Sequence, residues 1–107
     1  MTFSHHVMQD VHVLKLDRPL SGRWAGEVEL TFRAISQNGA SRVVFDMESI
    51  PFIDQHGLAA LVKGWELLNG SGKNLHLVSP QAQPQLVFEL TGFDKIFSIT
   101  DDAGKVV

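Results

Sequence analysis

Residues 42–70 read RVVFDMESIPFIDQHGLAALVKGWELLNG, and their hydrophobic pattern changes from that of a strand to that of a helix. The run Val43-Val44-Phe45 is short, continuously apolar and rich in β-branched residues, which indicates a buried strand. Asp54 comes before apolar residues spaced by three and four, so it is the expected N-cap of a helix that Gly70-Ser71-Gly72 ends. The expected core face of this helix consists of Leu58, Leu61, Val62, Trp65 and Leu68. A buried strand followed by an amphipathic helix is typical of α/β proteins.

The flanking sequence repeats this alternation of strand and helix patterns. Strands are expected in two pieces over residues 3–16, over 75–78 and over 96–99, and helices over 24–38, ended by Asn38-Gly39, and from Ser79 to about Leu90. Ser79 and Pro80 are the expected N-cap and first residue of the third helix, and Gly92 its C-cap. Strands separated by single helices favour right-handed crossovers and a mostly parallel sheet. The predicted fold class is α/β, a small mixed, mostly parallel sheet of four to five strands with three or more helices packed on it; the first two strands can pair as a hairpin.

The composition argues against several classes of function. The chain has 107 residues, which is the size of one domain over residues 1–107, and its formal net charge is -3 with no basic run. Nucleic acid is therefore not an expected partner. The chain has no cysteine, which removes disulfide and thiolate chemistry. No apolar run approaches the roughly 20 residues that span a bilayer, so membrane insertion is not expected. Met1–Asp10 has no apolar signal region, and we therefore expect a cytoplasmic location.

Few residues suggest catalysis or metal binding. His5 and His6 are neighbours in a strand pattern, so their side chains point to opposite faces and do not favour a metal site. Asp46 and Asp54 could both lie at the carboxyl edge of the sheet, where open α/β folds place their sites. Neither has a nucleophile or metal ligand near it in the sequence, so a turn acid and a helix cap are the simpler interpretation. We expect no enzyme activity, no cofactor and no metal.

The outer face of the second helix is more informative. Opposite its expected core face it would present Ala60, Lys63, Gly64 and Leu67, which carry one charge among them. The glycine costs about 1 kcal/mol of helix propensity relative to alanine. Small residues beside an exposed leucine would allow another surface to approach closely. The pattern favours a docking surface, with a sparsely charged face that binds nothing as the alternative.

A stretch of residues 43–61, VVFDMESIPFIDQHGLAAL, resembles the core signature of STAS domains, the family of the bacterial anti-sigma factor antagonists. A second match comes from residues 77–80 and 88–97, and the resemblance covers about residues 11–99. The order of strands and helices expected above is that of the family fold. The resemblance therefore implies a STAS-like α/β domain.

In that family the antagonist binds an anti-sigma factor, usually a serine kinase, and the kinase phosphorylates a Ser or Thr directly after the Asp that opens the second helix. Here that position is Gln55, which has no hydroxyl group, and Ser21 stands in the loop where the family usually has an acidic residue. The resemblance thus implies a binding protein that is not switched off at Gln55. The expected partner-binding residues are Ser21, Asp54, Gln55, His56, Gly57, Ala60, Lys63, Gly64 and Leu67.

Other functions remain open from the sequence. Small STAS proteins also serve as accessory subunits of ABC-type lipid transport complexes, in which the partner would be the ATPase subunit. A scaffold or ligand-sensing module of a signalling assembly is a further alternative, and it would show itself by a bound small molecule or a large oligomer. A homodimer is compatible with all of these alternatives.

Overall fold

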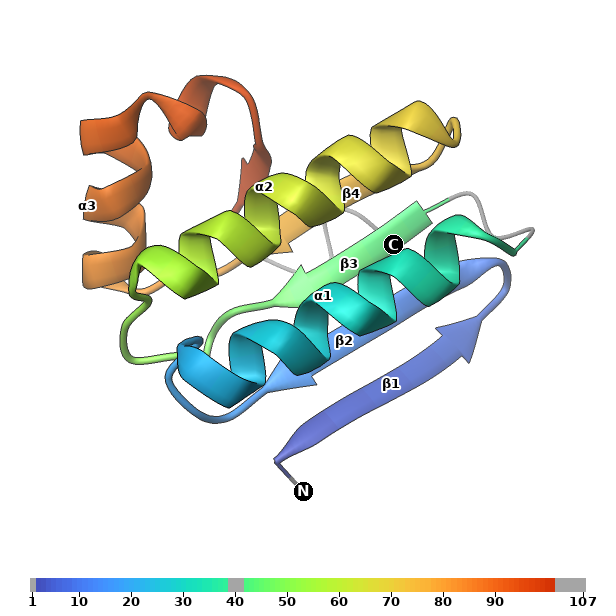
Figure 1. The fold of residues 1–107 in the computed structure, drawn as a ribbon, viewed down its shortest axis with the longest axis horizontal. Helices are drawn as coiled ribbons and strands as arrows, with labels where there is room; N and C mark the ends of the chain where they lie inside the picture. The colour runs from blue at the N-terminus through green and yellow to red at the C-terminus, as the bar shows by residue number, and fades with distance from the viewer. Residues whose placement is uncertain (1, 39–41, 102–107) are drawn as a thin grey trace.

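The computed structural model describes residues 2–38 and 42–101. The elements in chain order are β1 (Phe3–Met8), β2 (Val11–Leu16), α1 (Gly22–Ser36), β3 (Arg42–Asp46), α2 (Gln55–Gly70), β4 (Asn74–Val78), α3 (Ala82–Thr91), the 3-10 helix η1 (Phe93–Lys95) and β5 (Ser98–Thr100) (Figure 1). The sheet has the order β1-β2-β3-β4-β5, in which β1 pairs antiparallel with β2 and the later strands are parallel. The predicted α/β class and the hairpin at one edge are confirmed.

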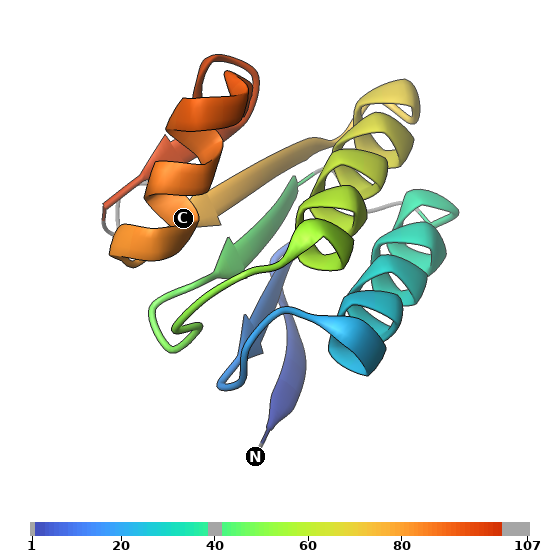
Figure 2. The ribbon, with the colours of Figure 1, turned by 60° about the vertical axis from the view of Figure 1, so that its left-hand side comes forward.

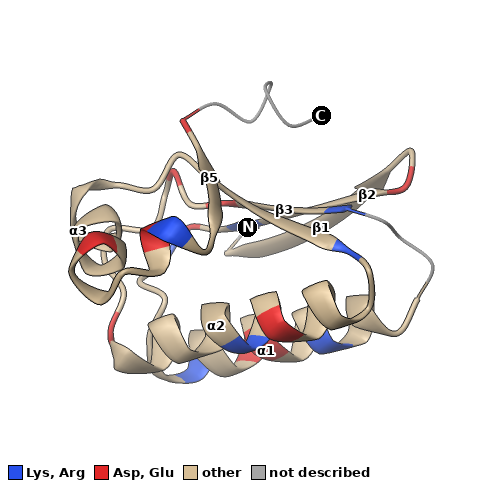
Figure 3. Cartoon of the chain, turned by 90° about the horizontal axis from the view of Figure 1, so that it is seen from above, with Lys and Arg blue, Asp and Glu red and all other residues tan. Residues whose placement is uncertain are grey.

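The sequential strand order places the helices on one side of the sheet. Each parallel pair is joined by a right-handed crossover, so successive helices fall on the same face. Figure 3 shows the sheet as one layer, with α1 and α2 side by side as the other. This arrangement leaves one face of each helix turned away from the sheet, and the site described below is on that outer side of α2.

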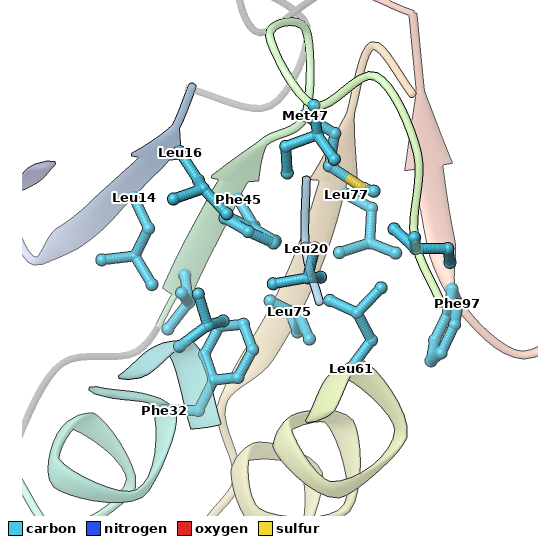
Figure 4. Packing of buried hydrophobic residues seen from close by; sticks show 14 of the residues in the cluster. Leu14, Leu16, Leu20, Phe32, Phe45, Met47, Leu61, Leu75, Leu77 and Phe97 are labelled. Carbon is cyan, nitrogen blue, oxygen red and sulfur yellow. The ribbon is translucent and has the colours of Figure 1, made fainter. Parts of the chain in front are cut away.

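The core lies between the sheet and the two long helices. On β2, Leu14 and Leu16 are buried on the helix side. In the parallel register Leu14 pairs with Phe45 on β3, and Phe45 pairs with Leu77 on β4. Figure 4 shows these side chains meeting Phe32 from α1 and Leu61 from α2. The alternation of buried and exposed positions along β2 is that of a strand with one face on the core.

The starts of the third helix and of the last strand differ from the sequence prediction. The third helix begins at Ala82 with Gln81 as its N-cap, so Ser79 and Pro80 are not its start. Ser79 has a φ of 54°, and its backbone N–H and hydroxyl donate to the carbonyls of Thr100 and Asp101 at 2.8 and 2.6 Å. These bonds tie Ser79 to the end of β5, which prevents it from capping the helix. The last strand covers Ser98–Thr100 and begins two residues later than expected.

The start of α2 and the end of α3 agree with their sequence signals, whereas α1 begins at Gly22, two residues before the predicted range. Asp54 is the N-cap of α2, and Gly92 adopts the left-handed conformation (φ 80°) as the C-cap of α3. The first helix ends at Ser36, with Gln37 as its C-cap, slightly before the predicted Asn38-Gly39. Gly39 itself lies outside the described residues.

Candidate functional site

The start of α2 is fixed to the loop that precedes α1. Leu20 and Ile53 form an isolated parallel bridge, and the Leu20 N–H donates to the carbonyl of Phe52 at 3.1 Å. The Asp54 carboxylate accepts a hydrogen bond from the Gly57 N–H at 2.8 Å, which satisfies one of the free amides of the first turn. Gly57 allows the two loops to approach, since a Cβ there would lie 2.0 Å from the carbonyl oxygen of Leu20.

The same loop is held from its other side by α3. The Gln83 side chain accepts from the Ile53 N–H at 2.8 Å and donates to the Ile53 carbonyl at 3.0 Å. This two-way amide contact imitates a strand pairing, so the segment before α2 is bonded to both flanking elements. The sequence carried no signal for it, because the two residues are 30 positions apart and glutamine is common on helix surfaces.

The small residues of α2 face inward, which corrects the docking face expected from the sequence. Ala60 is only 1% exposed, and Gly57 and Gly64 are buried. A Cβ at Gly64 would lie 2.2 Å from the Phe32 ring, so the glycine makes room for an aromatic side chain of α1. The small residues do allow a close approach, as the sequence suggested, but the surface that approaches α2 is α1 and the loop before it, not a partner protein.

The remaining predicted residues are divided between exposed and half-buried positions. Gln55, His56 and Lys63 are exposed on α2, whereas Ser21, Asp54 and Leu67 are half-buried. Ser21 occupies the N-cap position of α1 without a side-chain capping bond, and Asp54 is engaged in its own cap. The structure therefore brings Gln55 and Lys63 onto one open surface but keeps Gly57, Ala60 and Gly64 out of it.

An open groove of about 490 Å³ runs along this surface of α2. Its lining residues come from α1, α2 and η1 and are Glu29, Gln55, Leu58, Ala59, Val62, Lys63, Glu66 and Phe93. In Figure 2 the first turns of α2 lie between α1 and α3. Glu29 of α1 lines the groove on one side, and Phe93 of η1, which follows α3, lines it on the other. We call these eight residues the α2 groove.

Sequence reasoning missed the apolar part of the α2 groove. Leu58 and Val62 have core spacing and were expected to be buried, but both are half-buried and pack only against the edge of the core. The apolar stripe of α2 is wider than the sheet can cover, because the small residues Ala60 and Gly64 occupy the positions nearest α1. Its outer part is therefore left toward Phe93 of η1. The only advance signal was the width of the stripe.

The acidic residues considered for catalysis have structural partners. Asp46 accepts a hydrogen bond from the Glu48 N–H at 3.0 Å and lies 3.9 Å from the Lys15 ammonium group. Asp54 caps α2. The interpretation of one turn acid and one helix cap is consistent with these contacts. Within residues 2–38 and 42–101, no group of three or more potential metal ligands comes together, and no helix is long and apolar enough to cross a bilayer.

The fold and the groove can be compared with known proteins. The family model described as STAS domain matches residues 3–105, so this chain belongs to the STAS domain family. A Thermotoga maritima protein assigned as an anti-sigma factor antagonist has a TM-score of 0.90 and 24% identity, with 97% of this chain and 90% of that chain covered. An anti-sigma-factor antagonist (STAS) domain protein from Planctomyces limnophilus has a TM-score of 0.84, 18% identity and coverage of 99% and 95%.

The fold is also shared with a transport protein. A sulfate transporter family protein from Wolinella succinogenes has a TM-score of 0.82 and 19% identity, and the alignment covers 94% of this chain and 84% of that chain. At these identities the likeness shows the fold. The predicted family membership is confirmed, whereas the role of each predicted partner-binding residue stays a prediction.

Proposed function

We propose that this chain is a non-enzymatic binding protein of the anti-sigma factor antagonist type, and that an anti-sigma factor docks on the α2 groove and on the first turn of α2. The observation that carries the proposal is the groove itself: it begins at Gln55, the position that resembles the family's phosphorylation site, and continues along the exposed side of the same helix. The likeness to two antagonists over nearly the whole chain supports this choice of partner.

The composition of the α2 groove suits a reversible protein contact. Leu58, Val62 and Phe93 offer apolar surface, and Lys63 and Glu66 lie beside them on α2. Apolar centres with charged surroundings are typical of non-obligate interfaces, because the apolar groups bind and the charges set orientation. The bonds from Leu20, Asp54 and Gln83 hold the start of α2 in place, so little ordering cost is added when a partner binds.

The partner that we infer is a kinase-type anti-sigma factor that cannot release this chain by modifying Gln55. The glutamine side chain is neutral and exposed, and it has no hydroxyl oxygen to accept a phosphoryl group. Phosphorylation of a serine there would add about 1.5 to 2 negative charges to the contact. Without that charge, binding at the α2 groove persists in the presence of ATP.

The accessory subunit of a transport complex is the second candidate, since the fold is shared with a sulfate transporter family protein. In that case the groove would bind an ATPase subunit of the complex. Both candidates use the same surface of α2, so the identity of the bound protein separates them. Co-purification from an extract of the source organism, followed by mass spectrometry, is the direct comparison.

The docking surface is tested by Ala59→Arg, which adds a long charged side chain to the α2 groove at an exposed position. We expect binding to a purified kinase-type anti-sigma factor to weaken by tenfold or more, which corresponds to about 1.4 kcal/mol. Ala34→Arg, the same change at an exposed alanine of α1 outside the groove, is the matched control and should bind normally. Equal affinities of the two variants would place the contact elsewhere.

The claim about Gln55 has its own measurement. Incubation of the wild-type chain with the kinase and ATP should give no phosphate mass increment, whereas Gln55→Ser should accept one phosphoryl group. A modified residue in the first turn of the wild-type α2 would contradict the unswitched function.

A further inference from the structure

The hairpin formed by β1 and β2 lies at the edge of the sheet away from α3 (Figure 1). Its turn residues Gln9 and Asp10 both have positive φ angles, 49° and 74°, as in the tight turns that suit the twist of a hairpin. Among the described elements, β2 is the principal packing partner of β1. The attachment of β1 to the domain therefore depends on contacts with one strand.

Two histidines meet across this hairpin. His5 pairs with Leu14 in the register and Val7 pairs with His12, so the two imidazoles are diagonal neighbours on the helix side of the sheet. His5 Nε2 and His12 Nδ1 are 2.5 Å apart, and the ring centres are 4.8 Å apart. The distance between the ring centres is longer than the distance between the two nitrogens by about two ring radii. The rings therefore meet end-on, nitrogen to nitrogen, and are not stacked.

An end-on contact of this kind holds one hydrogen. When one imidazole donates and the other accepts, the contact is a hydrogen bond, but two imidazolium ions have only donors and cannot bond to each other. They would also bring two positive charges together, and His12 is only 6% exposed, so its charge would be poorly hydrated. Two positive charges this close together repel each other, and the repulsion grows as the surroundings become less polar.

The surrounding charged groups do not compensate for a second proton. On the helix side of the sheet His12 neighbours Leu14 on its own strand, Val7 on β1 and Val43 on β3, and none of these side chains is charged. Lys15 alternates to the other face, where it approaches Asp46 and Glu48. His6 also points to the other face of β1.

Of the charged groups at the ends of the hairpin and on α1, Glu27 of α1 is exposed to solvent. Asp17, which follows β2, lies 3.6 Å from Arg18, Asp10 belongs to the turn, and on α1 Arg33 lies 3.7 Å from Glu29.

We propose that the contact of His5 with His12 makes β1 an acid-sensitive edge strand, which is held on the sheet while the pair carries one shared hydrogen and loosens when both rings are protonated. This inference concerns the β1 edge of the sheet, which contributes no residue to the α2 groove, and it does not depend on the proposed function. The pair supplies only two nitrogen ligands, and within the described residues no third potential ligand joins them, so the site suits a proton better than a metal ion.

The electrostatics act in the direction that the geometry requires. Burial, and then the positive charges of His12 and His6, lower the pKa of His5 below its ordinary value of 6.5. A lowered pKa in the folded state means that folding favours the neutral imidazole. The hairpin contact is therefore fully present above pH 6.5 and is lost as the pH falls through the lowered pKa of His5.

Amide hydrogen exchange measured by NMR tests the proposal on the full chain. Between about pH 7.5 and about pH 4.5, a range that includes the ordinary imidazole pKa, the protection of the β1 amides should fall by about tenfold or more relative to those of β3, after correction for intrinsic exchange. His5→Gln keeps a polar side chain that cannot be protonated, and its β1 protection should be independent of pH. His6→Gln is the matched control, because it removes a neighbouring imidazole from the opposite face. It should keep a loss of β1 protection as large as in the wild type, at a slightly higher pH because the small lowering of the His5 pKa by His6 is gone.

The outcomes that overturn the proposal are equally specific. They are β1 protection that is independent of pH in the wild type, a response in His5→Gln as large as in the wild type, and a response that His6→Gln removes as completely as His5→Gln. Most of His5 is open to solvent and only its contact with His12 is part-buried, so its replacement should not prevent folding. Titration of the imidazole carbon-bound protons gives a second measurement: an ordinary titration of His5 in the wild type would overturn the proposal, and a return to ordinary titration in His12→Gln would support it.

Discussion

Replacement of Gly64 by alanine would place a methyl group against the Phe32 ring. The added Cβ would lie 2.2 Å from Cδ2 and 2.7 Å from Cε2 of Phe32, well inside van der Waals contact. The ring has no free direction in which to move, because it is fully buried and packs edge-on against Phe45 with ring centres 5.8 Å apart. Relief therefore requires α1 and α2 to separate or Phe32 to leave its rotamer.

The magnitude follows from two opposing effects. Overpacking of this kind costs roughly 1–3 kcal/mol or more, and the gain in helix propensity on replacing glycine offsets up to about 1 kcal/mol. With a backbone-fixed Cβ and a confined ring, we expect a net loss of about 2 kcal/mol in the free energy of unfolding. For a domain of this size, that loss lowers the melting temperature by about 10 °C.

The matched control is another glycine within a helix. Gly26 of α1 is exposed, and a Cβ there would meet no atom within 4 Å, so Gly26→Ala should stabilise the chain by up to about 1 kcal/mol. Urea unfolding of both variants measures the difference, which we expect to be about 3 kcal/mol with opposite signs. In a double-mutant cycle, Phe32→Leu should reduce the cost of Gly64→Ala. A Gly64→Ala variant that gains stability like Gly26→Ala would refute the internal role of the glycine.

Two further predictions concern the segment that holds the start of α2. Asp54→Ala leaves the Gly57 N–H without its cap and should lower the free energy of unfolding, measured with urea, by about 1 kcal/mol. Asp54→Asn keeps an equally good cap and should be nearly neutral. Similar losses in both variants would show that the charge of Asp54 matters more than its capping bond. Gln83→Ala removes both side-chain bonds to Ile53 and should accelerate hydrogen exchange of the Ile53 amide by about tenfold. This is the effect expected when a part-buried amide loses a hydrogen bond that contributes about 1–2 kcal/mol. Gln85→Ala, whose side chain bonds only to Glu89 among the contacts described, is the control and should leave that amide unchanged.

The elements that the sequence predicted well depend on short-range physics. The strand at Val43-Val44-Phe45 and the helix cap at Asp54 follow from side-chain periodicity and from hydrogen bonds between near neighbours. The left-handed Gly92 after α3 follows from the absence of a Cβ. The prediction for the start of α3 was wrong because it depends on long-range contacts: Ser79 is held by carbonyls of residues more than 20 positions away.

The order of the strands and the three α-helices, the mostly parallel sheet and membership of the family could thus be read from the amino-acid sequence, because they depend on patterns spread over many residues. Which side of α2 is free could be seen only once the helices were packed on the sheet. A small residue such as Gly64 permits a close approach whether the neighbour is a partner or Phe32 of the same chain, and its own spacing is identical in the two cases. The contacts of His5 with His12 and of Gln83 with Ile53 belong to the same class, since each depends on where the chain returns in space and not on the residues next to it.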